Sequence, residues 1–554
     1  MSVEFTLDGR PVVAPRDGVS LLEALREDLG EKSPKDGCAP QGQCGCCTVL
    51  VDGSPRVACV TPVRRVAGRA VVTAGGLEAD VLARLVSSFA DHGASQCGFC
   101  TPGILCRLAP LGPEPDPVKV ETALLAHLCR CTGWRTIVDA ACDPGPDPGT
   151  PGDPKNLKNP KNPEKAGRSA SLAAMRATIE GGAPQSVGPQ VALGNGGFAD
   201  DTGPPGCLVA VPDGAGGWAL GETLAEARAA SGKVQGRRSG QALTYPVEVP
   251  PGDWDVVLQT TWVEPAYLEP DASWCEPGGE PVSPFANGGA FGGKISSVAP
   301  AAARELAGRL GRAVRVVLSR EDVVRLGPKR PPIAAGIRID GSGVLRVVAA
   351  PGIAEAAGSV SKAIVVEEVD VVGPPVSALL RAAGWAEVAV LAEAARALRE
   401  GRAAGSNDPA APDGASSGTA RVTSPAGSTA EATVTVDASG RPVGIGVEIS
   451  CGPMLDEVTL RSYLTGACHM ALGWVFSEGI AVGEDGVPED LTIRSFGILR
   501  ARETPPVELV VNRGGDETGP AVNGSDAVFA AVAAGAWIAQ GLPSRWPTHR
   551  GRNA

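Results

Sequence analysis

Ten of the chain's fifteen cysteines lie before residue 132, and this crowding constrains the fold and the chemistry more than any other feature. With 554 residues the chain can bury several cores without cross-links, and disulfides do not persist in a reducing compartment. Thiols that gather in such a protein are expected to bind metal. The remaining cysteines are interpreted as small core residues, as is Cys106: Cys142, Cys207, Cys275, Cys451 and Cys468.

Charge and hydropathy exclude two classes of partner. The formal net charge of −12, with no basic stripe, argues against nucleic-acid binding, which needs clustered Lys and Arg. The N-terminal MSVEFTLDGR has neither the basic leader nor the apolar core of a signal peptide, and no apolar run reaches the ~18 residues of a membrane span. We expect a cytoplasmic protein without a membrane segment, and the sequence leaves a homo-oligomer open.

The first cysteine motif is a short glycine-rich loop, GCAPQGQCGCC, at residues 37–47. Cys38, Cys44 and Cys47 are spaced C-x5-C-x2-C, and Cys59 follows after a further eleven residues. Plant-type ferredoxins hold a [2Fe-2S] cluster with C-x4-C-x2-C and a distant fourth cysteine, so this spacing is one residue longer. Glycine lets backbone N–H groups approach the cluster sulfurs. A zinc site built from the same four cysteines stays open on spacing alone.

The segments around this loop predict a β-rich unit with one helix. VEFTLDGRPVV predicts a β-hairpin, and SLLEALREDLG predicts a helix with Ser20 and Glu23 as a capping box. Residues 76–142 have a helical pattern, and the proline-rich stretch 143–168 is interpreted as a linker. The rest of the chain is mixed strand and helix, with a second loose connector expected over 404–429.

A second cysteine motif lies in the helical segment. QCGFCTPG supplies Cys97 and Cys100 as C-x2-C, and HLCRCTGW supplies Cys129 and Cys131 as C-x-C. Each pair adjoins a predicted helix, and together they can provide four thiolates. The spacing alone leaves both an iron–sulfur cluster and zinc open.

The two motifs in this order resemble the iron–sulfur part of the molybdenum hydroxylases, the xanthine dehydrogenase and aldehyde oxidoreductase family. The resemblance implies an α+β multidomain fold: a β-grasp, plant-type ferredoxin-like domain (1–75), a four-helix domain (76–142), the linker (143–168) and a shortened mixed α/β molybdopterin-binding region (169–554), with no flavin domain. It also implies two [2Fe-2S] clusters. Their ligands would be Cys38, Cys44, Cys47 and Cys59 for the first, and Cys97, Cys100, Cys129 and Cys131 for the second.

The C-terminal part is similar to the molybdenum-binding region of the same family. The similar stretches are EPAYLEPDASW, NGGAFGGK, LLRAAGWAE and SCGPMLDEVTLRSYLTGACHMALGW. The resemblance implies molybdenum held by molybdopterin, and it leaves the cytosine dinucleotide form of the cofactor open. The residues implied to bind the cofactor are Gly288, Gly289, Ala290, Phe291, Gly292, Arg381 and His469. Read alone, GGAFGGK is a plain turn and His469 a core residue.

Two departures from the family stand out. Where the family carries a general-base glutamate, NGSDAVF places Asp526, whose side chain is one carbon–carbon bond, ~1.5 Å, shorter. Read without the family, Asp526 is a turn or N-cap residue before a helix. The stretch from about 190 to 550 is also much shorter than the family's molybdenum part.

The resemblance implies hydroxylation of an aldehyde or of an N-heterocycle such as xanthine, with water as the oxygen source and Asp526 as the catalytic base. Electrons would leave through the two clusters to an external acceptor or a separate flavoprotein. One alternative is a non-catalytic electron-transfer or assembly protein with a degenerate molybdopterin part. A zinc-stabilised binding module is another.

Overall fold

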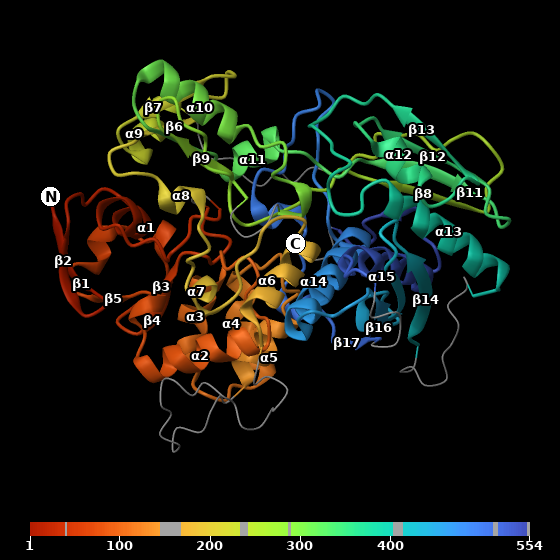
Figure 1. Cartoon of the computed structure of the whole chain (residues 1–554), viewed down its shortest axis with the longest axis horizontal. Helices are drawn as coiled ribbons and strands as arrows, with labels where there is room; N and C mark the ends of the chain where they lie inside the picture. The colour runs from red at the N-terminus through yellow and green to blue at the C-terminus, as the bar shows by residue number, and fades with distance from the viewer. Residues whose placement is uncertain are drawn as a thin grey trace.

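A computed structural model of the chain describes residues 1–38, 41–143, 168–232, 242–285, 290–402, 414–512 and 519–550. Within these residues the chain forms an α+β structure with four separate β-sheets (Figure 1). The N-terminal elements lie together at one side of the molecule, and the C-terminal helices lie near its middle. Most of the expected 143–168 linker lies outside the described residues, as do Gly288 and Gly289.

The first sheet is crossed by one short helix, as the sequence predicts. The hairpin is present as an antiparallel pair in which Leu7 faces Arg10. Helix α1 (Leu21–Glu23) continues as a π-helix (Ala24–Asp28), and the Ser20 hydroxyl accepts the Glu23 N–H at 3.1 Å. The capping box is not closed, because the Glu23 carboxylate pairs with Arg16 at 2.9 Å. The strand order is β2 (Arg10–Ala14), β1 (Val3–Leu7), β5 (Ala70–Val72), β3 (Thr48–Val51), β4 (Ser54–Val57).

Helices then follow over residues 79–142, where the sequence predicts them. Cys106 on the second of them is 1% exposed, which agrees with its interpretation as a core residue. Asp116 caps the third by accepting the Val118 N–H at 2.9 Å. The α-helices are α2 (Ala79–Asp91), α3 (Thr101–Leu108), α4 (Pro117–Ala123) and α5 (Arg135–Cys142).

The remaining residues build three more sheets and the helices that cover them. One sheet has the order β7 (Trp218–Gly221), β6 (Leu208–Pro212), β10 (Val314–Val317), β9 (Ala272–Cys275) and packs against α9 (Leu224–Ser231) and α10 (Ala299–Leu310). The next has the order β13 (Ile364–Val369), β12 (Gly343–Val348), β11 (Ile333–Ile337), β8 (Val256–Thr260), β18 (Arg545–Trp546). The last has the order β14 (Ser416–Thr423), β15 (Thr429–Val436), β16 (Pro442–Ser450), β17 (Val507–Val511).

The expected loose connector at 404–429 is wrong from residue 416 onward, where strand β14 begins; residues 404–413 lie outside the described part. The small polar residues that suggested a loop form one exposed face of the sheet. On that face Ser417 pairs with Thr435 and Thr419 with Thr433, each at 2.9 Å. The alternate residues are apolar or glycine and pack against a helix. The strand therefore has the usual two-residue alternation, but its many small polar residues made the sequence look like a loop.

Two almost wholly buried helices fill the centre of the molecule (Figure 1): α14 (Glu457–Phe476) and α15 (Ser525–Ala539). Alanine and other apolar residues cover every face of α15, which is typical of a helix surrounded by protein. It packs on β14, β15, α14 and α13 (Trp385–Arg399). No helix in the described ranges is long and apolar enough to cross a bilayer.

The N-terminal elements and the C-terminal part are joined by buried polar contacts. Arg130 donates two hydrogen bonds to Glu478, at 2.5 and 2.7 Å, and both side chains are at most 3% exposed. The Trp134 indole N–H donates to the Leu499 carbonyl at 3.1 Å. A bidentate, fully desolvated ion pair of this kind fixes the orientation of the two parts because breaking it would leave a buried charge unpaired.

Candidate functional site

The first thiol quartet is assembled by the β3–β4 hairpin and the loop before it. Cys47 directly precedes β3 and Cys59 directly follows β4, so antiparallel pairing brings them together, and the Cys59 N–H donates to Cys47 Sγ at 3.4 Å. The Cys38 side chain hydrogen-bonds with those of Cys44 and Cys59, which lowers the pKa of the Cys38 thiol. Cys38 Sγ also accepts the Gln41 N–H at 3.3 Å. Thiolate ligands receive such backbone N–H bonds in iron–sulfur sites.

The second quartet lies at the start of α3. Cys97 Sγ and Cys131 Sγ are 3.6 Å apart, and the side chains of Cys100 and Cys129 hydrogen-bond to each other. The bond from Cys100 lowers the pKa of Cys129 to about 6, and Thr132 adds a contact at 3.2 Å. Two thiolates on one tetrahedral metal, with bonds of ~2.3 Å, stand ~3.7 Å apart.

The thiols of the second quartet contact in separate pairs. Each iron of a two-iron cluster takes two thiolates, whereas a zinc ion takes all four at one point. The pairing of Cys97 with Cys131 and of Cys100 with Cys129 therefore fits a [2Fe-2S] cluster better than zinc.

The two quartets are held close by tight backbone packing. A Cβ on Gly103 of α3 would lie 2.3 Å from the Gly45 carbonyl oxygen, and one on Gly45 would lie 2.5 Å from the His127 ring. Only glycine permits this approach. Burial lowers the pKa of His127 to about 3, so this imidazole is neutral, and it contacts the Thr48 hydroxyl at 3.2 Å. The close packing suits electron transfer between two centres.

An inner pocket adjoins the second quartet. Cys97, Cys100 and Cys131 form one wall, and the opposite wall comes from the glycine-rich segment and its neighbours. Among the side chains that line the pocket, Gln185 Oε1 and Glu269 Oε1 are buried amide and carboxylate oxygens that lack a hydrogen-bond partner within the described residues. The other residues that matter here are Arg130, Tyr267, Ala290, Phe291, Lys294 and Tyr463.

A middle pocket continues from the inner one, and the two share Arg130 and Phe291 as walls. The Arg381 guanidinium lies 4.4 Å from the centre of the Phe291 ring, and its Nη1 lies 3.3 Å from the Met470 sulfur. Trp474 and Phe529 complete the apolar wall. The predicted residues Phe291 and Arg381 are thus brought together from segments 90 residues apart.

Asp526 lies beside the middle pocket, in the first turn of α15. Its Oδ1 is 3.2 Å from Arg381 Nε, and its backbone N–H donates to Asn523 Oδ1 at 3.0 Å. Burial raises the pKa of Asp526, and Arg381 partly opposes this effect. Asp526 also lines an outer cavity of about 390 Å³, whose wall includes Trp385 and Pro425.

His469 does not take the position expected for a cofactor contact. It is fully buried on α14, its Nε2 lies 2.9 Å from the Leu499 carbonyl oxygen, and burial lowers its pKa to about 4. The next residue, Met470, lines the middle pocket instead. Successive helix residues are turned by ~100°, so a one-residue difference decides which side chain faces the site.

Gly292 and Ala290 have different roles in the glycine-rich segment. Gly292 has a φ of +91°, and a Cβ there would lie 1.8 Å from the Leu379 carbonyl oxygen, so only glycine fits. Ala290 lines the inner pocket.

Sequence reasoning missed Glu269, Glu478 and Met470, although Glu269 stands inside the quoted stretch EPAYLEPDASW.

The inner pocket offers groups that suit a pterin. A pterin edge carries N–H donors and ring acceptors, which match the unpartnered Gln185 Oε1 and the nearby Lys294 ammonium. The cavity volumes of the inner and middle pockets, about 50 and 40 Å³, are smaller than the ~300 Å³ of a typical small-molecule site. The chemistry of the donor set therefore fits a pterin, whereas the two cavity volumes are below that of a typical small-molecule site.

Comparisons with known proteins divide the chain into two parts. Residues 73–142 match the family model described as a [2Fe-2S] binding domain. The chain is 38% identical over 150 residues to the nicotine 6-hydroxylase small subunit of Paenarthrobacter nicotinovorans. The aligned residues make up 26% of this chain and 90% of that subunit. It is 35% identical over 150 residues to the xanthine dehydrogenase iron-sulfur-binding subunit of Escherichia coli O157:H7, and these residues make up 26% of this chain and 93% of that subunit.

The fold of the whole chain is similar to that of a solved enzyme. The aldehyde oxidoreductase from Desulfovibrio gigas superimposes with a TM-score of 0.69 over 99% of both chains, at 15% sequence identity. The sequence relatives cover the iron–sulfur quarter, and the structural match extends the fold over the remainder. The chain therefore belongs to the molybdenum hydroxylases, the molybdopterin-dependent oxidoreductases of the xanthine dehydrogenase and aldehyde oxidoreductase type.

Proposed function

We propose that this chain hydroxylates an aldehyde or an aromatic N-heterocycle, with water as the oxygen source. The observation that carries the proposal is the order of the sites: two thiol quartets, the inner pocket, the middle pocket, Asp526 and the outer cavity adjoin one another. The names of the relatives, which act on nicotine, xanthine and aldehydes, support this substrate range. An outer cavity of about 390 Å³ lies within the ~300–1,000 Å³ of small-molecule sites.

The residues divide into cofactor contacts and a base. Ala290, Phe291 and Arg381 would hold molybdopterin in the inner and middle pockets. When bound, the molybdenum centre would accept two electrons and activate the oxygen of water. Asp526 would take the proton, and Arg381 would keep its carboxylate oriented.

The two quartets would carry the electrons away one at a time. We propose Cys97, Cys100, Cys129 and Cys131 as ligands of the cluster next to the inner pocket, and Cys38, Cys44, Cys47 and Cys59 as ligands of the outer one. The acceptor would be an external protein, such as a separate flavoprotein subunit, since several relatives are named as subunits of larger enzymes.

The test is metal content together with turnover, on protein made in a host that supplies the cofactor. We expect about four irons and one molybdenum per chain, and oxidation of an aldehyde or N-heterocycle with an artificial electron acceptor. The small volumes of the inner and middle pockets favour one competing function, a 2Fe-2S electron carrier. Four irons without molybdenum, and no turnover, would replace the hydroxylase with that carrier.

Charge reversal near Cys59 is expected to weaken electron delivery. Arg56, Arg64 and Arg65 are exposed near this cysteine, and the segment 54–69 has no acidic residue. Basic patches attract acidic partners over the ~10 Å Debye length at 0.1 M salt. Arg64→Glu/Arg65→Glu should therefore raise the KM for an acidic flavoprotein acceptor roughly tenfold at low salt.

Turnover with a small uncharged acceptor should be unchanged in the same variant. Arg309→Glu is the matched control. It also reverses an exposed positive charge, since the Arg309 side chain is 59% exposed, but it lies on α10, which covers another sheet. Equal KM values for the protein acceptor in all three proteins would place the docking surface elsewhere.

A further inference from the structure

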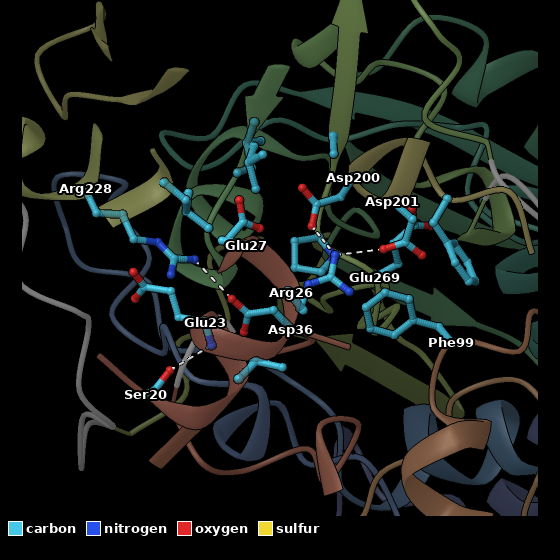
Figure 2. Close-up of a pocket in the computed structure, with 17 residues that line it drawn as sticks. Ser20, Glu23, Arg26, Glu27, Asp36, Phe99, Asp200, Asp201, Arg228 and Glu269 are labelled. Atoms are coloured by element: carbon cyan, nitrogen blue, oxygen red, sulfur yellow. Dashed lines mark hydrogen bonds and ion pairs between the residues drawn. The ribbon is translucent and has the colours of Figure 1, made fainter. Parts of the chain in front are cut away.

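A side pocket lies on the N-terminal side of the molecule, away from the middle pocket and the outer cavity, and acidic side chains line much of it (Figure 2). It lies between the α1 region, helix α8 (Ala199–Thr202) and strand β9, and its volume is about 70 Å³. Arg26 lies between two carboxylates in this pocket, 2.8 Å from Asp200 and 2.7 Å from Asp201. The pocket is rich in acidic side chains, and these are Glu23, Glu27, Asp36, Asp200, Asp201 and Glu269.

Glu269 lines the side pocket and the inner pocket at once. The residue is 8% exposed, and its Oε2 accepts a hydrogen bond from Lys294 Nζ at 2.6 Å. Its Oε1 has no hydrogen-bond partner among the described residues. Phe99, which stands between Cys97 and Cys100 in sequence, also lines the side pocket. Glu269 is thus a titratable group in the wall between a carboxylate-lined cavity and the second thiol quartet.

The charges around Glu269 leave it able to change protonation near neutral pH. Burial raises its pKa to about 7; Asp271 and Asp201 add to the increase, and Lys294 opposes it. Asp201 is itself bound by Arg26 and by Lys35. Lys294 keeps a second acceptor, the Pro284 carbonyl oxygen at 3.3 Å, when Glu269 is neutral.

The pocket reaches partly exposed groups on its other side. The side chains of Glu23 and Asp200 are each 22% exposed, and that of Arg228, which binds Asp36 at 3.1 Å, is 28% exposed. A proton that reaches the side pocket therefore has carboxylate oxygens available toward solvent. The cavity has room for ordered water, which needs only ~10–15 Å³ per molecule.

We propose that Glu269 is a proton relay that carries protons from the inner pocket to the side pocket during turnover. The inference rests on the proposed hydroxylation, R–H + H₂O → R–OH + 2 H⁺ + 2 e⁻, whose electrons leave through the thiol quartets to the acceptor. Asp526, which lines the outer cavity, takes one of these protons, and the other has to leave on the side of the inner pocket. Glu269 accepts a proton on Oε1 from the inner pocket and releases it to water or a carboxylate in the side pocket. It is a positioning and transfer group and does not contact substrate.

The test compares Glu269→Gln with Glu321→Gln, a control of equal burial at 8% exposure that lines neither pocket. In stopped-flow turnover with a pH dye, Glu269→Gln should slow proton release about tenfold and raise the solvent deuterium isotope effect, with iron and molybdenum content unchanged. Glu269→Asp should restore part of the rate because it keeps a carboxyl group. Equal proton-release rates in wild type and Glu269→Gln would overturn the proposal.

A readout independent of turnover is the reduced-minus-oxidised infrared spectrum of the iron-loaded protein. Wild type and Glu321→Gln should show a carboxylic acid C=O band between pH 6 and 8 that is missing in Glu269→Gln. If Glu269→Gln misfolds because Lys294 loses its carboxylate partner, Glu269→Gln/Lys294→Met removes both charges and should lack the same band. A wild type without turnover that shows the band would reject the hydroxylase and keep Glu269 as a redox-linked proton acceptor. Absence of the band in wild type would reject the relay.

Discussion

Cys129→Ser is expected to remove one of the two [2Fe-2S] signals in the electron paramagnetic resonance spectrum of the reduced protein, and Cys47→Ser the other. Iron should fall from about four to about two atoms per chain in each variant. The physical reason is that Cys129 and Cys47 belong to different quartets, each linked by its own thiol–thiol contacts. Serine is a poor ligand for iron that prefers thiolate.

The matched control is Cys468→Ser, which changes a buried cysteine of α14 outside both quartets. It should keep about four irons and both signals, at some cost in thermal stability. Loss of neither signal in the ligand variants would contradict the assignment. A colourless wild-type protein that contains zinc in place of iron would favour the alternative of a zinc-stabilised binding module.

Asp526→Asn is expected to stop catalysis while iron and molybdenum content stay intact. General-base catalysis contributes roughly 10²–10⁴-fold, so kcat should fall by about that factor. The amide cannot take a proton, but it keeps the size of the side chain and a hydrogen-bond acceptor for Arg381. Steady-state kinetics with an artificial acceptor, together with metal analysis, measures both expectations.

The pH profile gives a second check on Asp526. Only the carboxylate form accepts a proton, and burial raises the pKa of Asp526 above its usual value. The rate of the wild type should therefore fall as the pH decreases through that raised pKa. Asp80→Asn, at the same helical position in the first turn of α2, is the control and should leave kcat unchanged. If the Asp526→Asn variant is active, Asp526 is not the catalytic base and has only a structural role at the start of the helix.

Local patterns were enough to predict the N-terminal elements. The hairpin at residues 3–14 and the helix beginning after Ser20 depend on strand alternation and a cap within a few residues. The cysteine motifs depend on fixed short spacings, so they also identified both groups of thiols. The connector around 416–429 was mispredicted because alternating serine and threonine on a strand's exposed face has the composition of a loop.

The sequence by itself determined which residue types gather in each motif and the family that they resemble. Only the tertiary structure decided which side chains meet: Cys97 with Cys131, Arg381 with Asp526, and Glu269 between two pockets. It also turned Met470, and not His469, toward the middle pocket. Arg381 and Asp526 are 145 positions apart, and contacts at that separation follow from how helices and sheets pack. Spacing along the chain determines side-chain direction only within one element.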